Sequence, residues 1–386
     1  MIIYKHILSK VCIAFYTILL SYTKEEETKM KHVVRKTIDA KKHRIVIIHH
    51  NDMDGFVSAM IAFKYYKEKW ENRAEYVFFS SDYTDEFDLT ELSALDTVVI
   101  VDYSVPVQVA DELLEKTNAI VWIDHHASAI AKYSGHEFNE VAGFRSVGLS
   151  ASELTWLFFF GNCQKASVEC FDDRTTGQPI DYFQFNDTGK MYSIQDLMGH
   201  KGDTRFPIGV RKAGLYDTFR FSTYEQYLEN MAFSDGFYTL GFCPMDTEEN
   251  IKFFDDLFSF KPTESVAKII QKGTAVVEYK LHNFASLVKR NGFACKLRKF
   301  EDIKAIAINT DSKSTFIFET VRNDYEVGIV FNMNKEGRMN YSIYRLGLNP
   351  TKNIPVNKIA ETFGGGGHAN AAGFSTNGTL VVDRVI

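Results

Sequence analysis

The sequence predicts an α/β protein, with a parallel, doubly wound sheet in its N-terminal domain and a helical linker to a smaller α/β C-terminal domain. Three observations predict this. Apolar strand-like runs alternate with helical patterns in the first part of the chain, helical spacing dominates between residues 248 and 290, and strands resume after residue 292. The length of 386 residues allows two or three domains with real cores.

In the first part, short apolar runs rich in β-branched or aromatic residues have the character of strands. The expected strands are 44–50, 75–80, 97–104 and 118–126. The intervening segments place apolar residues at helical spacing or form apolar runs long enough for a buried helix. The expected helices are 55–70, 105–116 and 149–160. Strand–helix–strand repetition indicates right-handed crossovers and a sheet that is covered on both faces.

The alternation of strand-like and helical segments stops at residues 161–208. We interpret this segment as an insertion that acts as a functional lid or remains a disordered loop. Thr263, which follows Pro262, begins a helix of the linker. The C-terminal domain is expected to contain strands 303–309, 314–321, 327–333 and 339–346 and a helix at 357–363. The predicted parts are an extension (1–30), an N-terminal domain (31–260), and the linker with the C-terminal domain (261–386).

Composition narrows the class of protein. Apolar residues are 45% and charged residues 24%, which excludes a disordered chain, a collagen-like fibre and a polytopic membrane protein. The net charge of −6 excludes a protein that coats nucleic acid with a wholly basic surface, but it does not exclude a local basic groove. Five cysteines without a Cys-x-x-Cys pair argue against a disulfide framework or a zinc cluster and favour the cytoplasm.

The apolar run 11–20 is too short to cross a membrane as a helix. It has the length of a signal-peptide core, but no small-x-small cleavage site follows it. We therefore interpret residues 1–30 as a dispensable extension with Met30 as the functional start, and keep a signal or anchor as the alternative.

Acidic and imidazole side chains follow three of the expected strands. The carboxyl ends of parallel strands meet at one edge of a sheet, where carboxylates repel one another unless cations neutralise them. A mixed Asp/His set suits Mn²⁺, and one carboxylate, such as Asp102, can bridge two ions about 3.5–4 Å apart. If residues 50–54 stay extended, alternate side chains point the same way. The residues are His50, Asp52 and Asp54, then Asp102, then Asp124, His125 and His126.

Each of these residues has a simpler interpretation. A single Asp at a strand end is more often a helix N-cap than a ligand, and His49 fits a position in the core. The combination of three such strand ends favours the metal site.

A second group lies near the C-terminus, where four glycines, 364–367, precede His368. Successive backbone N–H groups in such a turn can bind an anion, and His368 adds a donor for phosphate. The alternative is a flexible helix cap and linker. Arg345, at the end of an expected strand, can clamp a phosphate, although taken alone it is more often a surface charge.

Four blocks in this order, HNDMDG, VDYS, DHH and GGGGHANAAGF, resemble the DHH phosphoesterase superfamily with its DHH-associated C-terminal domain. The resemblance spans roughly residues 44–386. Members include RecJ-type exonucleases, oligoribonucleases that also act as pAp phosphatases, and cyclic-dinucleotide phosphodiesterases.

The resemblance implies a role for each matching residue. One metal ion would bind His50, Asp52 and Asp102, and a second would bind Asp54, Asp102, His125 and a downstream Asp. Asp124 would orient the neighbouring imidazole, and His126 would face the substrate phosphate. The second domain would bind the nucleotide through Arg345, Gly366, Gly367 and His368. The downstream Asp is Asp217 in GLYDTFR, or alternatively Asp203 in KGDTRF.

The expected function is a phosphoesterase with two Mn²⁺ ions, for which Mg²⁺ or Co²⁺ can substitute, acting on short oligonucleotides or nucleotides in the cytoplasm. Stable membrane association is not expected, and homodimerisation is left open. The alternatives are a cyclic-dinucleotide phosphodiesterase and a non-catalytic scaffold that binds nucleic acid.

Overall fold

The computed structural model describes residues 43–81, 89–168, 180–199, 204–312, 314–346, 355–367 and 369–385. The expected extension 1–30, Asp203 and His368 lie outside the described residues. Among the helices of the described part, none combines the length and the apolar character needed to cross a membrane.

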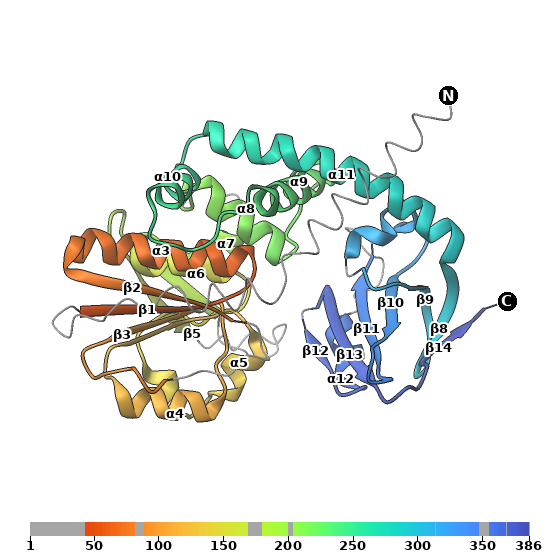
Figure 1. Cartoon of the computed structure of the whole chain (residues 1–386), viewed down its shortest axis with the longest axis horizontal. Coiled ribbons are helices and arrows are strands. Elements are labelled where there is room, and N and C mark those ends of the chain that lie inside the picture. The colour runs from red at the N-terminus through yellow and green to blue at the C-terminus, as the bar shows by residue number, and fades with distance from the viewer. Residues whose placement is uncertain are drawn as a thin grey trace. The chain divides into compact units, whose positions relative to one another are not determined.

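The first sheet has four strands in the order β2-β1-β3-β4 (Figure 1). Its members are β2 (Ala74–Ser81), β1 (His43–His50), β3 (Thr97–Val101) and β4 (Ile120–Ile123). The pairs β1–β3 and β3–β4 are parallel. All four predicted strands are thus present, and the order reverses between β1 and β3, which is where parallel α/β sheets bind ligands.

Helices cover both faces of this sheet (Figure 1). They are α3 (Met53–Trp70) and α6 (Ala151–Phe159) on one face, and α4 (Val107–Lys116) and α5 (Ala127–Lys132) on the other. Alternation along β1 sends Ile45 and Ile47 into one buried cluster and Val46 and Ile48 into another. The predicted doubly wound architecture is confirmed. Two short 3₁₀ helices, η1 (Glu71–Arg73) and η2 (Glu137–Glu140), lie in the connections.

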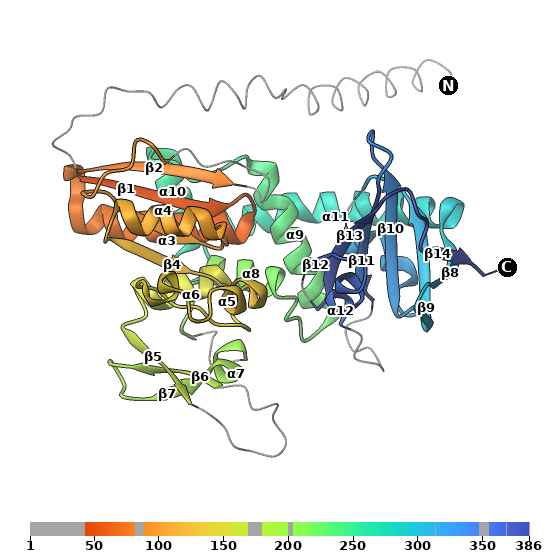
Figure 2. The same ribbon diagram turned by 90° about the horizontal axis from the view of Figure 1, so that it is seen from below.

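The described part of the 161–208 insertion is ordered into strands and a helix rather than an irregular loop (Figure 2). Strands β5 (Cys163–Val168), β6 (Ile180–Phe185) and β7 (Met191–Ser193) form an antiparallel sheet, followed by α7 (Ile194–Met198). Phe183 and Phe185 are buried while Gln184 is exposed. This two-residue alternation turns Phe183 and Phe185 inward, into the same buried cluster as Ile45 and Ile47 of β1.

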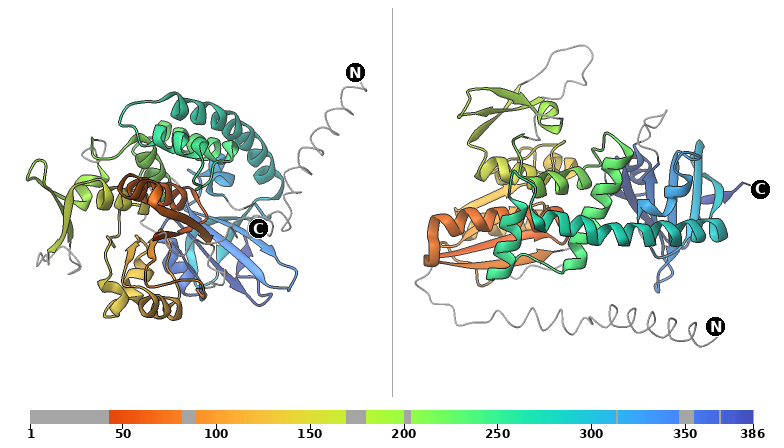
Figure 3. Two further views of the ribbon diagram at one scale, coloured as in Figure 1. Left: turned by 60° about the vertical axis from the view of Figure 1, so that its left-hand side comes forward. Right: turned by 90° about the horizontal axis from the view of Figure 1, so that it is seen from above.

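Four helices follow the insertion, and two of them cross in backbone contact. They are α8 (Ile208–Asp217), α9 (Tyr224–Leu240), α10 (Glu248–Leu257) and α11 (Glu264–Asn291). Helix α9 lies alongside α11 (Figure 3, green and cyan). A Cβ atom on Gly273 of α11 would lie 1.6 Å from the carbonyl oxygen of Ala232 in α9, so the crossing needs glycine. Thr263 caps α11 as predicted, since its side chain accepts a hydrogen bond from Val266 N.

The C-terminal sheet has the order β12-β13-β11-β10-β9-β8-β14. The elements are β8 (Phe293–Leu297), β9 (Phe300–Asn309), β10 (Val327–Met333), β11 (Met339–Arg345), α12 (Val356–Glu361), β12 (Gly366–Gly367), β13 (Ala371–Thr376) and β14 (Val382–Arg384). The pair β9–β10 is parallel, and the other pairs are antiparallel.

The predicted strand at 314–321 is wrong. This run forms the 3₁₀ helix η4 (Thr315–Val321), capped by Ser314, whose side chain accepts a hydrogen bond from Phe316 N. Ile317 and Phe318 are fully buried in the turn. A short apolar run buries its side chains in a strand or in a helical turn, so its pattern does not separate the two.

Candidate metal centre

The HNDMDG block forms a tight turn from β1 into α3. Asp52 is the N-cap of α3, and its Oδ1 accepts a hydrogen bond of 2.9 Å from Gly55 N. Its Oδ2 lies 2.9 Å from Nδ1 of His50, the last residue of β1. A Cβ on Gly55 would lie 2.2 Å from the His50 carbonyl oxygen, so only glycine permits this turn. The extended geometry considered for residues 50–54 is wrong, because α3 begins at Met53.

Asp54 lies in the first turn of α3 and is almost fully buried. Its carboxylate meets the N-terminus of α6, where it accepts hydrogen bonds from Ala151 N (2.8 Å), Ser152 N (3.3 Å) and the Ser152 hydroxyl. Helix N-termini stabilise negative charge. Burial and the charge of Asp217 nevertheless raise the pKa of Asp54 to about 7. Asp54 therefore sits in a site where further positive charge is stabilising.

Asp102 directly follows β3 and has a left-handed backbone, with φ of 55°. Its N–H donates to the Ile123 carbonyl of β4, which fixes the carboxylate at the edge of the sheet. The side chain is buried, and its Oδ1 lies 3.3 Å from Nε2 of His125. Burial, followed by the charges of Asp52 and Asp54, raises the pKa of Asp102 well above its usual value.

Asp217, the last residue of α8, joins this cluster from the other side. Its Oδ2 lies 3.4 Å from Nε2 of His125. Burial and the charge of Asp52 raise the pKa of Asp217 to about 7. Burial lowers the pKa of His125, which favours the neutral imidazole that a metal ion requires. Of the two downstream carboxylates considered, Asp217 thus lies in the cluster, and Asp203 is outside the described residues.

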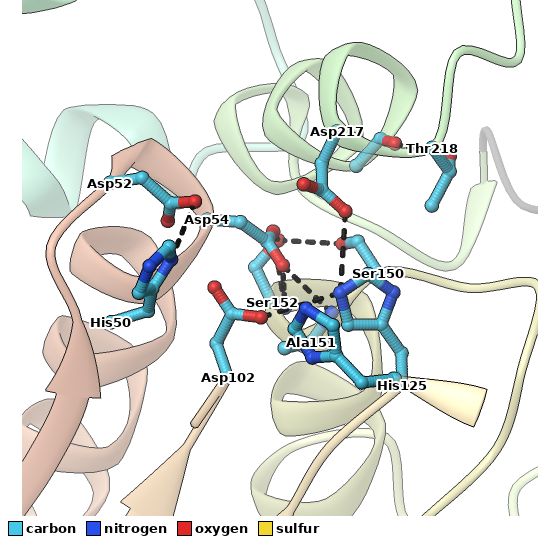
Figure 4. Close-up of polar contacts among 12 residues, drawn as sticks. His50, Asp52, Asp54, Asp102, His125, Ser150, Ala151, Ser152, Asp217 and Thr218 are labelled. Carbon is cyan, nitrogen blue, oxygen red and sulfur yellow. Dashed lines mark hydrogen bonds and ion pairs between the residues drawn. The ribbon is translucent and has the colours of Figure 1, made fainter. Parts of the chain in front are cut away.

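The ligand atoms form two adjoining groups (Figure 4). Within each group they lie within 4.8 Å of one another. One group is His50, Asp52 and Asp102, and the other is Asp54, His125 and Asp217. A third combination, Asp102, His125 and His126, overlaps both of them. Oδ1 of Asp102 and Oδ2 of Asp217 are buried yet accept no hydrogen bond from any residue that the structure describes. Buried carboxylate oxygens without donors, next to imidazoles, fit divalent cations as ligands.

Asp124 lies behind this cluster and holds the loop after β4. Its Oδ1 accepts hydrogen bonds from His125 N (2.7 Å), His126 N (3.1 Å) and His126 Nδ1 (2.7 Å), and its Oδ2 accepts one from Ser104. Burial lowers the pKa of His126, but the hydrogen bond to Asp124 and the charges of Asp124, Asp217 and Asp52 together outweigh burial, so the pKa is raised. Asp124 therefore keeps the proton of the neutral imidazole on Nδ1, and its charge favours addition of the second proton, on Nε2.

His49, in contrast, belongs to the core. It is buried, its Nδ1 lies 2.8 Å from the His50 carbonyl oxygen, and its ring packs edge-on against Phe56. Burial lowers the pKa of His49 to about 4. This residue is neutral at physiological pH and stabilises the strand end.

The candidate nucleotide-binding residues of the C-terminal domain lie around the start of β13. Arg345, the last residue of β11, donates its backbone N–H to the Asn370 carbonyl (2.9 Å). Gly366 and Gly367 form β12 and pair with β13. Gly367 has φ of 136°, and a Cβ there would lie 2.7 Å from the backbone of Ala372, so this position requires glycine.

Sequence reasoning missed the residues that support Asp54 and Asp217. These are Ser150, Ser152, Glu153, Arg211 and Arg220, which bond to one another or to Asp54. The signal was present in Ser150-x-x-Glu153, the pattern of a helix capping box, at the start of a run that we assigned only as a buried helix.

These features define a two-domain α/β protein with a candidate dinuclear metal centre at the carboxyl ends of a parallel sheet. Comparison with protein families identifies it further. The profile of the DHH family N-terminal domain matches residues 44–167, and the profile of the DHHA1 domain matches residues 293–386. The chain belongs to the DHH superfamily and carries a DHHA1 domain at its C-terminus.

Solved structures that resemble the chain share little sequence with it. The DHH domain of a member of a family of ribosomal proteins has a TM-score of 0.51 at 14% identity, covering 87% of this chain and 83% of that one. The pGpG-specific phosphodiesterase PggH from Vibrio cholerae has a TM-score of 0.42 at 14% identity, covering 86% and 93%. RecJ from Thermus thermophilus in complex with Mn²⁺ has a TM-score of 0.40 at 15% identity, covering 88% and 50%. No curated protein sequence matches the chain.

Proposed function

We propose that the chain is a metal-dependent phosphoesterase that hydrolyses phosphodiester or phosphomonoester bonds in short oligonucleotides or nucleotides. The observation that carries this proposal is the pair of adjoining ligand groups, in which buried oxygens of Asp102 and Asp217 accept no hydrogen bond from the described residues. Membership of the DHH superfamily supports the same class of reaction.

His50, Asp52 and Asp102 would hold one ion, and a second would be held by Asp54, Asp102, His125 and Asp217. The mixture of imidazoles and carboxylates suits Mn²⁺, with Mg²⁺ or Co²⁺ as substitutes. When bound, two such ions supply Lewis-acid stabilisation of the charge on phosphoryl oxygens.

The remaining residues would bind and orient the substrate. Asp124 keeps the proton on Nδ1 of His126, and the upward shift in the pKa of His126 favours a cation next to a substrate phosphate. Arg345, Gly366, Gly367 and His368 would hold the nucleotide part, through a guanidinium and backbone N–H groups suited to an anion.

The test uses the purified full chain with Mn²⁺ and a panel of substrates: dinucleotides, pAp, cyclic dinucleotides and longer strands. We expect hydrolysis of the short substrates that stops in excess chelator and returns with Mn²⁺. Hydrolysis at full rate in chelator would refute the metal mechanism. Binding of the nucleic acids without any turnover would identify a scaffold instead, and preference for cyclic dinucleotides would identify a signalling phosphodiesterase.

A further inference from the structure

Glu153 is a fully buried carboxylate in the first turn of α6, outside both ligand groups. Its Oε1 accepts a hydrogen bond of 2.9 Å from Nη1 of Arg211. Its Oε2 accepts hydrogen bonds from Nη2 of Arg220 and, at 3.0 Å, from Ser150 N. Ionised carboxylates are rarely buried unless they are paired, and this one has two guanidinium partners.

One side of this network determines the surroundings of Asp54. Glu153 and Ser150 form a capping box, in which Glu153 bonds to Ser150 N while the Ser150 hydroxyl bonds to Glu153 N. The capping box fixes the first turn of α6. The N–H groups of Ala151 and Ser152, which lie in this turn, are the ones that donate to the carboxylate of Asp54.

The other side determines the position of Asp217. Arg211 lies in α8 upstream of Asp217, and Arg220 follows it by three residues. Arg220 also donates to the hydroxyl of Thr218, the residue next to Asp217. Gly214, in the last turn of α8, packs directly on Glu153, because a Cβ there would lie 2.5 Å from Cδ of Glu153. Helix α8 is thus held against Glu153 on both sides of its ligand.

The contacts of Glu153 near Asp54 and its contacts near Asp217 support ligands of the same group. Asp54 and Asp217 belong with His125, whereas Asp52 and His50 of the other group are fixed by the β1–α3 turn. A defect at Glu153 should therefore act on one ligand group and leave the other in place.

We propose that Glu153 is a positioning residue, which sets the separation of Asp54 from Asp217 and thereby controls occupancy of the ion held by Asp54, His125 and Asp217. The inference rests on the metal centre of the proposed function. Loss of residues that orient metal ligands reduces metal affinity by about 10–100-fold.

The experiment measures how many Mn²⁺ ions bind, and how tightly, by isothermal titration calorimetry. The electron paramagnetic resonance signal of coupled Mn²⁺ pairs then reports whether both positions are occupied. The full wild-type chain is expected to bind two ions. Glu153→Gln keeps the size of the side chain but leaves two guanidinium groups without a carboxylate. It should bind one ion at wild-type affinity and the second about 10–100-fold more weakly, with activity restored by excess Mn²⁺.

Two further variants separate positioning from folding. Gly214→Ala pushes α8 away from Glu153 without changing any charge, and it should weaken the same ion. The matched control is Asp96→Asn, which breaks another buried ion pair, with Arg44. This pair lies where β1 and β3 begin, at the opposite ends of these strands from His50 and Asp102. Asp96→Asn should lower the melting temperature while both ions still bind at wild-type affinity.

Each outcome distinguishes the two proposals. Selective weakening of one ion in Glu153→Gln and Gly214→Ala supports the positioning role. Two ions bound at wild-type affinity by Glu153→Gln would overturn it, and so would joint loss of both ions in proportion to lost stability, as for a purely structural residue. Failure of the wild-type chain to bind two ions would refute the metal centre itself.

Discussion

Nε2 of His125 lies 3.3 Å from Oδ1 of Asp102, although 23 positions separate the two residues along the chain. The parallel ladder of β3 and β4 aligns Val101 with Ile123, and Asp102 N extends that ladder with a bond to the Ile123 carbonyl. The two side chains therefore meet because their strands end together. Asp102 belongs with His50 and Asp52 in one combination of ligand atoms and with His125 and His126 in another, so it connects the two ligand groups through His125.

This shared position predicts that Asp102 is the most sensitive ligand. Asp102→Asn keeps the shape of the side chain, and Asn tolerates the left-handed backbone of this position. We expect turnover to fall by about 100–1,000-fold, more than for His50→Ala, since a bridging carboxylate serves both ions. Rates measured over a range of Mn²⁺ concentrations test this. An equal or smaller loss than in His50→Ala would contradict the bridging role.

Without metal ions, repulsion between the buried carboxylates should lower the stability of the folded protein. In chelator, Asp102→Asn is expected to melt about 2–4 °C above wild type, because it removes one of several like charges held close together. Mn²⁺ should reverse the order, since an ion at 100 times its Kd stabilises the folded wild type by about 2.7 kcal/mol. Differential scanning calorimetry with and without Mn²⁺ measures both. A variant less stable than wild type in chelator would refute the repulsion argument.

The identity of the downstream ligand stays a prediction. Asp217→Asn should reduce turnover strongly, although by less than Asp102→Asn, because this carboxylate lies beside His125 at 3.4 Å but belongs to a single ligand group, whereas Asp203→Asn should retain most of the turnover. Side-by-side kinetics of the two variants, with folding checked by circular dichroism, decide between them. The opposite ranking would move the ligand to Asp203.

The strands of the first sheet were predictable because burial on both faces leaves nearly continuous apolar runs, as in 97–101, which forms β3. The ligand candidates at their ends followed from the rule that parallel strands end together. Periodicity does not predict which residues share an ion. The turn at Gly55 separates Asp54 from Asp52, and that turn depends on a close contact with the His50 carbonyl oxygen.

The role of Glu153 and the helical turn at 314–321 were not predictable from the sequence, because both depend on contacts between distant parts of the chain. Glu153 appears in the sequence as one polar residue at the start of an apolar helix, and its role depends on arginines 58 and 67 residues away. The run 314–321 has the apolar content of a strand, but its capping by Ser314 and the burial of its middle residues favour a 3₁₀ turn. Both outcomes depend on tertiary contacts that local pattern does not encode.

The crossing of α9 and α11 predicts a sharp effect of a single methyl group. Gly273→Ala places a Cβ 1.6 Å from the Ala232 carbonyl oxygen and forces the helices apart, which should lower the free energy of unfolding by about 1–3 kcal/mol. Thr274→Ala, one residue along on the exposed side of α11, is the control and should change stability little. Urea denaturation measures both. Equal stability of the two variants would show that the helices separate without cost.

The last prediction concerns substrate length. Enzymes that hold long single strands use a continuous basic groove or a stacking platform. This chain is net acidic, with a charge of −6. Its densest basic runs are residues 41–44 and the group Lys289, Arg290, Lys296, Arg298 and Lys299. Within the described residues, Arg44 of the first run pairs with buried Asp96, and Arg298 of the second bonds to Asp383. Arg44 is therefore not available to bind phosphates, and the charge of Arg298 is partly offset by an acid on the surface.

We accordingly expect kcat/KM for RNA or DNA of two to five nucleotides to exceed that for a strand of several tens of nucleotides. Contact with two or three phosphates gives a slope of log K against log salt of about −2, because few counterions are released. The measurement compares both lengths over a range of salt concentrations with an inactive variant, Asp102→Asn, for binding. Faster degradation of the long strand with a much steeper salt dependence would favour an exonuclease that follows long strands, because only many simultaneous phosphate contacts produce such a slope.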